Sequence, residues 1–138
     1  MANVITNQFL TKLQEKAYNL ESDVIKVALL DDTVAPDKDD TTFSDTNEIS
    51  GAGYTAGGAT LAGSTVTQDD SGDLAKWDAT DITWSTLTMT DARYAVIYDT
   101  TVTNDIIGYI DFGTNRSSVS SDFKITWSAS GLTTTAQA

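Results

Sequence analysis

Cysteine and histidine are both missing from the chain, and proline occurs once, at Pro36. Without cysteine there is no disulfide, thiol nucleophile or thiolate-bound zinc, and without histidine there is no Ser-His-Asp triad and no imidazole proton shuttle. The sequence therefore predicts no catalytic residue, no cofactor and no metal centre. We expect that the protein is not an enzyme.

Positive charge is also scarce. The 138 residues include 8 Lys and Arg against 20 Asp and Glu, which gives a formal charge of −12. A nucleic-acid-binding surface needs clustered cations that neutralise phosphates, whereas the cations here are spread along the whole chain. We therefore expect no nucleic-acid partner, and the net charge favours solubility.

Long apolar runs are absent as well. No stretch approaches the roughly 20 apolar residues that cross a bilayer, which argues against a membrane partner. The beginning, Met1 to Gln8, lacks the basic start and the apolar core of a signal peptide, so we expect synthesis in a cytoplasm. The length fits one domain spanning residues 1–138.

The N-terminal segment has the periodicity of a helix. Its apolar residues recur at spacings of three and four, which places on one stripe Ile5, Phe9, Leu13, Ala17 and Leu20. This pattern predicts an amphipathic helix over about residues 3–20 with Asn3 as its N-cap. Such a helix either docks on a sheet or is presented to a partner.

From residue 23 onward the apolar period becomes two, which is typical of β-strands. We expect about seven strands, separated by turns every eight to twelve residues, over a β-rich body of about residues 23–134. This pattern predicts a mainly β fold, an antiparallel β-sandwich or barrel with one N-terminal α-helix. The predicted strands are 24–30, 59–67, 74–79, 82–89, 93–98, 106–112 and 123–128, with a short one near 132–134.

Three connections in this body can be predicted in more detail. The turn residues 68–73 join strands 59–67 and 74–79 as a hairpin. The pair Ile82 and Trp84 has the opposite parity to the pair Leu87 and Met89, so a bulge near residues 85–86 would bring both pairs to the core. The Ser- and Asn-rich segment 113–122 is interpreted as a turn.

Two predicted loops are unusual in their length or composition. The acidic loop 31–48 is long for a compact domain, but it does not form an EF-hand because Thr42 stands where the calcium loop needs glycine. A weak, irregular cation site there remains an open alternative. The glycine-rich segment 50–58 precedes a strand rather than a helix with a lysine, which argues against a phosphate-binding loop.

The aromatic residues suggest one further class of function. Trp84 and Trp127 are in phase with other apolar residues and are expected in the core. Trp77 and Tyr54 are the better candidates for exposed rings that stack on sugars. A carbohydrate- or host-surface-binding module is therefore an alternative function.

Six blocks of the sequence, taken in their order and spacing, resemble a family of small virion structural proteins encoded by tailed bacteriophages and prophages. The resemblance covers about residues 3–134, and its blocks are residues 22–30, 48–58, 81–84, 92–98, 107–113 and 123–127. It implies a structural role without activity or cofactor. Head decoration (cement) is the first choice within the particle, and a tail or fibre component is the alternative.

A decoration protein of this kind would lie on the outer capsid surface of the virion after synthesis in the host cytoplasm. The resemblance implies the major capsid protein as its partner, and a homo-oligomer or many copies on each particle. Repeated modest contacts then add up to strong binding. For the partner interface we single out the loop that contains Glu48, Tyr54, Gly57 and Gly58, together with the acidic loop before it.

Overall fold

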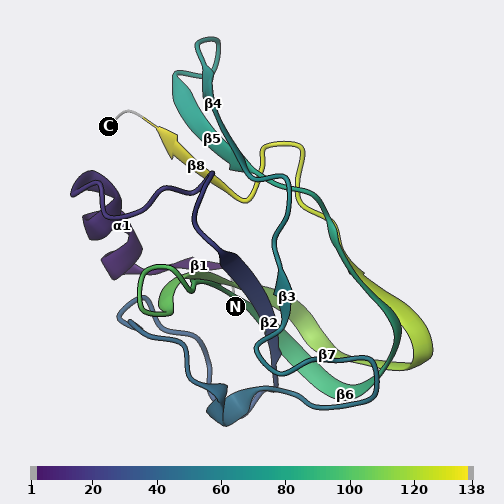
Figure 1. Cartoon of the computed structure of the whole chain (residues 1–138). Helices are drawn as coiled ribbons and strands as arrows, with labels where there is room; N and C mark the ends of the chain where they lie inside the picture. The colour runs from purple at the N-terminus through teal and green to yellow at the C-terminus, as the bar shows by residue number, and fades with distance from the viewer. Residues whose placement is uncertain (1–2, 137–138) are drawn as a thin grey trace.

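The structure, a computed structural model, describes residues 3–136 as two antiparallel β-sheets and one short α-helix (Figure 1). The predicted mainly β, sandwich-like class with one helix near the N-terminus is confirmed. The elements in chain order are β1 (Val4–Ile5), α1 (Asn7–Gln14), β2 (Ile25–Leu30), a 3₁₀ turn (Asp45–Asn47), β3 (Ala59–Thr60), β4 (Thr65–Asp69), β5 (Leu74–Asp78), β6 (Ile82–Asp99), β7 (Asp105–Ile125) and β8 (Thr133–Ala136).

The larger sheet has the order β1-β7-β6-β2-β3, and the smaller sheet has the order β4-β5-β8. Strands β6 and β7 form one hairpin that pairs from Asp99 and Asp105 at the turn to Ile82 and Ile125 at the far end. This ribbon curves beneath the molecule in Figure 1, while the smaller sheet projects at the opposite end. The predicted hairpin forms between β4 and β5. Its predicted first strand, 59–67, is wrong in extent, because residues 59–60 form β3 beside β2 and β4 begins at Thr65.

The bulge predicted from parity in β6 is present. The register shifts between Trp84 and Leu87, and Thr86 at that point adopts φ 53°. As a result Ile82, Trp84, Leu87 and Met89 are all buried. An extra residue in one strand turns the following side chains to the other face. The bulge therefore allows both pairs, Ile82–Trp84 and Leu87–Met89, to point into the core.

The turn predicted at residues 113–122 is wrong, because this segment continues β7. It pairs with β6, for instance Ser118 with Met89 and Arg116 with Ala92. Most of the segment is exposed, so it has no apolar alternation that would mark it as a strand. The partner strand holds it in an extended form that its own Ser and Asn content does not favour.

The helix is shorter than predicted. Residues 4–5 form β1 beside β7, and the N-cap is Thr6, whose Oγ1 accepts the Phe9 N–H, rather than Asn3. The helix ends at Gln14, and Lys16 in the left-handed region (φ 61°) turns the chain. Phe9 is buried in the core, so the helix docks on the sheet rather than standing free for a partner.

The main core lies between the two sheets and α1. It contains one face of β2 and β6 together with Trp77 of the small sheet. The opposite face of β2, β6 and β7 carries a second apolar cluster, which the acidic loop 31–48 covers. Phe43 of that loop stacks on Tyr98 with ring centroids 4.2 Å apart. The loop therefore works as a cover of the sheet.

Candidate functional site

Four residues predicted for an interface meet at one place, where the glycine-rich loop crosses β2. Glu48 Oε1 accepts hydrogen bonds from the Tyr54 hydroxyl and from the Gly57 N–H, both at 2.6 Å. The Tyr54 hydroxyl also accepts the Leu29 N–H at 3.0 Å. We call Glu48, Tyr54 and Gly57, with the backbone that they join, the Glu48 brace.

Glycine is needed at two positions of the brace. Gly57 and Gly58 have φ of 89° and 81°, a region that residues with a side chain rarely adopt. A Cβ on Gly58 would lie 2.0 Å from the carbonyl oxygen of Val27, so the loop contacts the β2 backbone directly. The Gly57 carbonyl accepts the Tyr98 hydroxyl at 2.6 Å, which ties the loop to β6 as well.

The electrostatics of the brace suit a structural role. Burial and the hydrogen bond to Glu48 raise the pKa of Tyr54 well above its usual value, so the phenol stays protonated and keeps donating. Burial also raises the pKa of Tyr98. Both hydroxyls therefore hold the loop rather than act as bases, and a proton on each is required for its bond.

The sequence could indicate only part of this arrangement. Glu48, Tyr54, Gly57 and Gly58 are close in sequence, and the glycine content singles out their loop. Tyr98 and Leu29 complete the brace from β6 and β2, and neither was predicted. No local signal identifies them, because Tyr98 is 41 positions from its partner Gly57.

The acids of the loop 31–48 are also bonded within the chain. Asp37 Oδ1 accepts the Asp39 N–H, and Asp40 Oδ2 accepts the Asp37 N–H and the Tyr109 hydroxyl. Asp39 Oδ1 accepts the side-chain amide of Asn7. Within residues 3–136 there is no group of three or more His, Cys, Asp or Glu with metal-ligand geometry. These carboxylates fold the loop over the sheet.

A buried carboxyl, Asp99, lies at the turn between β6 and β7 and is next to Asp23. Asp99 is fully buried, and its Oδ1 accepts the N–H groups of Thr101 and Val102. Burial and the neighbouring Asp23 raise the pKa of Asp99 to about 6. Asp99 Oδ2 has no hydrogen-bond partner among the described residues. An ionised Asp99 is therefore poorly compensated.

A mixed cluster joins α1 to the start of β7. The Lys12 Nζ lies 2.5 Å from Asp105 Oδ2, which also accepts the Tyr18 hydroxyl at 3.0 Å. Asp105 is buried, whereas Lys12 is partly exposed. Burial and Asp105 raise the pKa of Tyr18 above its usual range. The cluster pairs a buried charge and holds the helix against the sheet.

The predictions for the aromatic residues are right in part. Trp84 is buried as expected, and Trp127 is half-buried against the core. The expectation that Trp77 is exposed is wrong: the side chain is buried, and its Nε1 donates to Ser64 Oγ. Tyr54 is half-buried within the brace. The two rings singled out for sugar stacking are therefore engaged inside the protein.

The hollows of the described surface are open. One hollow beside the brace is lined by several carboxylates, namely Asp31, Asp32, Glu48 and Asp91. A more enclosed hollow has no charged residue in its lining, which includes Ile107, Ile110, Trp127 and Leu132. None of the described helices is long and apolar enough to cross a membrane.

Comparison with protein-family models, with curated proteins and with solved structures gives no match to this chain. The fold and its site therefore define the molecule by themselves. It is a mainly β protein with antiparallel sheets, whose candidate site is a set of hydrogen bonds that fixes a glycine-rich loop.

Proposed function

We propose that the chain is a structural protein of a tailed-phage particle, a head decoration or cement protein. It binds the outer surface of the capsid in many copies and stabilises the shell, and its partner there is the major capsid protein. This role needs shape, durability and solubility rather than a reaction.

The observation that carries the proposal is the position of the six blocks that resemble phage virion proteins. The blocks fall on the parts that hold the fold together: β2, the Glu48 brace, and both ends of β6 and β7. Because the similar blocks lie in parts that stabilise the fold, the resemblance indicates a similar overall shape. It supports a protein whose function is carried by its surface and its stability.

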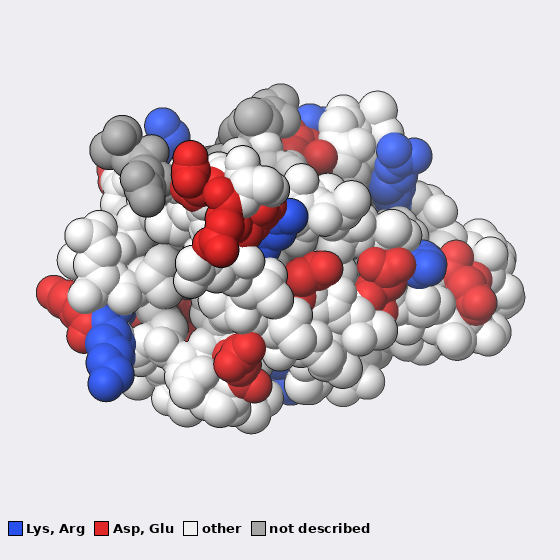
Figure 2. All heavy atoms as spheres, turned by 90° about the horizontal axis from the view of Figure 1, so that it is seen from above, with Lys and Arg blue, Asp and Glu red and all other residues white. Residues whose placement is uncertain are grey.

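The use of charge supports the same role. Among the described residues, four of the eight cationic side chains form ion pairs with carboxylates, namely Lys12, Lys76, Arg93 and Lys124. The face seen in Figure 2 carries separate carboxylates with lysine and arginine side chains scattered among them, and most of this face is uncharged. Net negative charge keeps many copies soluble before they reach the particle.

The brace also limits which residues of the loop are free to contact the shell. The side chains of Glu48 and Tyr54 are bonded inward, and Gly57 and Gly58 contact β2 and β6. The exposed members of the loop are its neighbours, such as Thr55 and Ala56. In this proposal the brace presents the loop in a fixed form, so that little ordering entropy is lost on binding.

The test mixes the purified protein with expanded, undecorated heads of the phage that encodes it, followed by electron cryomicroscopy. The expected result is regularly repeated density on the outer shell and a rise in the temperature at which heads release DNA. Heads without added density would contradict the proposal. Immunogold labelling of virions at the tail, with none over the shell, would favour the tail or fibre alternative.

Two variants locate the contact. Thr55→Glu with Ala56→Glu places charges on the exposed loop, and Ala129→Glu with Ser130→Glu adds the same charge to an exposed segment after β7. We expect the first pair to reduce head binding at least tenfold and the second pair to leave it unchanged. Equal binding by both pairs would place the contact away from the loop.

A further inference from the structure

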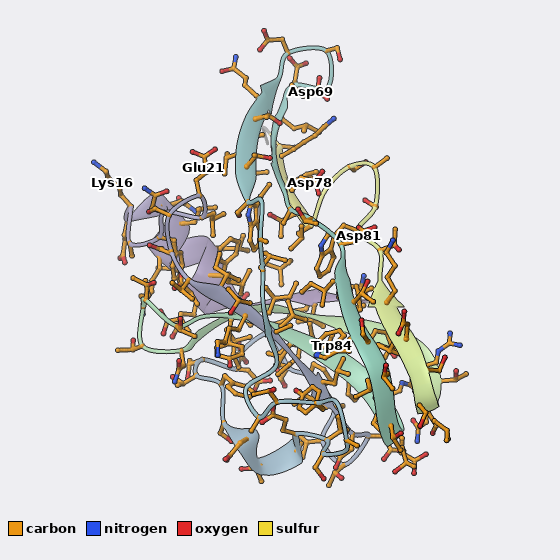
Figure 3. All side chains as sticks on the ribbon, turned by 45° about the vertical axis from the view of Figure 1, so that its right-hand side comes forward. Lys16, Glu21, Asp69, Asp78, Asp81 and Trp84 are labelled. Carbon is orange, nitrogen blue, oxygen red and sulfur yellow. The ribbon has the colours of Figure 1, made fainter. Side chains whose placement is uncertain are left out.

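The strand edges of the described chain differ in how they are protected. On the outer edge of β4 the Val66 N–H is already paired, because it donates to Glu21 Oε1 at 2.9 Å. Figure 3 shows Glu21 beside β4. Strand β7, beyond its short pairing with β1, contains three charged residues, namely Arg116, Asp122 and Lys124. Charged or covered edges of this kind resist pairing with another chain.

Strand β8 lacks both kinds of protection. It forms the end of the smaller sheet and pairs on one side only, with β5. Its sequence, Thr133–Ala136, contains no charge and no proline, and most of it is exposed. Threonine is a good strand former, so this edge offers its free backbone groups in an extended form.

The sheet that ends in β8 is also poorly covered. It projects away from the larger sheet (Figure 1), and β4 is exposed along almost its whole length. A shallow hollow on it includes Val66, Leu74, Ala75 and Ala136, and Val66 is 44 % exposed. Three strands with so little apolar cover are marginal by themselves, so additional strands would stabilise them.

We propose that the β8 edges of two copies pair antiparallel about a twofold axis, which joins the two small sheets into one sheet of six strands. We take a second copy of the chain as the partner because an uncharged edge can meet the same edge of another copy without repulsion between like charges. In a molecule with a net charge of −12, the uncharged β8 lets two copies pair their backbones without placing carboxylates opposite each other.

The acidic hairpin tips are compatible with this pairing. The tip contains Asp69, Asp70 and Asp73, and it lies next to Ala136, since Leu74 pairs with Ala136. In an antiparallel pair the tip of one copy lies at the Thr133 end of the other. Four residues of strand measure about 13 Å, which exceeds the Debye length of about 8 Å at physiological salt.

The pairing is weak in free solution. Four residues on each side form a contact well below the size of a stable interface, so the dimer populates only at high protein concentration. On a surface that binds many copies the effective concentration of the chain is far higher, so the weak β8 pairing then adds to the binding of each copy. The proposal does not depend on the capsid assignment: self-association and head binding are measured separately, and either can fail alone.

The test is sedimentation equilibrium of the full chain over a range of protein concentrations in about 0.01 M and about 1 M salt. The Debye length falls from about 30 Å to about 3 Å between these conditions, which screens the repulsion between acidic copies. We expect a concentration-dependent dimer that is at least tenfold tighter in high salt. A chain that stays monomeric at millimolar concentration in high salt would overturn the proposal.

A matched pair of variants tests the edge itself. Thr135 and Gln68 are both exposed and both lie opposite Ala75, Thr135 on β8 and Gln68 on β4. Lysine at either position lowers the net negative charge equally, so charge alone predicts tighter association for both. We expect Thr135→Lys to weaken the dimer at least tenfold and Gln68→Lys to retain it.

The fold of each variant is checked by near-ultraviolet circular dichroism, which reports the buried Trp77. If Thr135→Lys alters that spectrum, Ala136→Lys on the same edge replaces it in the comparison. An equal effect of the β8 and β4 lysines, or a dimer that survives lysine on β8, would refute pairing through β8.

Discussion

Gly58 and Gly113 have almost the same backbone conformation in different surroundings. Their φ angles are 81° and 79°, but a Cβ on Gly58 would lie 2.0 Å from the Val27 carbonyl oxygen, whereas a Cβ on Gly113 would meet nothing within 4 Å. Gly113→Ala should therefore cost only the backbone term, about 1 kcal/mol. Gly58→Ala adds a backbone clash and should cost at least twice as much, about 2–4 kcal/mol.

Urea unfolding of the two glycine variants and of the parent chain measures this difference. Because the backbone term is shared, the excess in Gly58→Ala reports the contact between the glycine-rich loop and β2. Equal losses would mean that the loop does not press on β2, and the brace as described would be wrong.

The buried Asp99 should make stability depend on pH. Its pKa is raised to about 6 by burial and by Asp23, against 3.8 for the ordinary carboxyl. The folded chain therefore holds this proton more tightly than the unfolded chain. Between about pH 4 and pH 6 the free energy of unfolding falls as pH rises, and the loss is complete above pH 6.

The variant Asp99→Asn removes that loss while its Oδ1 can still accept the Thr101 and Val102 N–H groups. We expect it to be more stable than the parent chain by about 1 kcal/mol at pH 7.5, and the gain to shrink at pH 4.5. Asp73→Asn, on the exposed hairpin tip, makes the same charge change and serves as the control. Urea midpoints at the two pH values give the comparison, and a gain independent of pH would contradict it.

At the scale of the element, the bulge in β6 sets the direction of the long ribbon. Thr86 has φ 53° there, which is unfavourable for a β-branched residue. Thr86→Gly should raise stability by about 1 kcal/mol, because the strain of that conformation is relieved and the backbone bond from its N–H to Asp122 Oδ1 can remain. Thr83→Gly, in the regular part of β6, should lower it by about as much.

Thermal unfolding of Thr86→Gly and Thr83→Gly measures both effects. The two substitutions are chemically identical and lie three positions apart, so a difference in sign isolates the backbone conformation. If both variants lose stability equally, Thr86 is not strained and the bulge has another cause.

The same bulge illustrates which parts of the fold the sequence could predict. The pairs Ile82–Trp84 and Leu87–Met89 would point to opposite faces of a regular strand, and this conflict can be seen in a short stretch of sequence. One extra residue near position 86 is the simplest way to bury both pairs. Residues 113–122 carry no such pattern in the sequence, because β6 provides the pairing and most of the segment is exposed. The predicted helix is too long because Leu20 reaches the core from beyond the end of the helix, which continues the apolar stripe without the helical backbone.

The candidate site was predictable to the same degree. The four residues from Glu48 to Gly58 belong to one loop, and their glycines indicate an unusual backbone. The hydrogen bonds that fix the loop also need Leu29 on β2 and Tyr98 on β6, and these two strands are neighbours only in the folded sheet. A contact between distant strands has no signature in one sequence, so the loop was predicted as an interface while the structure gives it internal bonds.

At the scale of the whole molecule, Trp77 connects the small sheet to the main core. Trp77 belongs to the small sheet but is buried in the main core, and its Nε1 donates to Ser64 Oγ, which itself donates to the Leu20 carbonyl. The rest of the small sheet has little apolar cover. The anchoring of the small sheet to the body therefore depends strongly on this residue.

We expect Trp77→Ala to lower the free energy of unfolding by about 3–5 kcal/mol, the usual cost of removing a buried aromatic ring. The loss should be uneven: hydrogen exchange should become faster in β4, β5 and β8 by a larger factor than in β2 and β6, since the small sheet can open while the large sheet stays paired. Trp127→Ala, which removes a half-buried ring on the same core, should cost less than half as much and leave β4 protected. Equal acceleration of exchange in both sheets of Trp77→Ala would instead mean that the molecule unfolds as one unit, with Trp77 acting as an ordinary core residue.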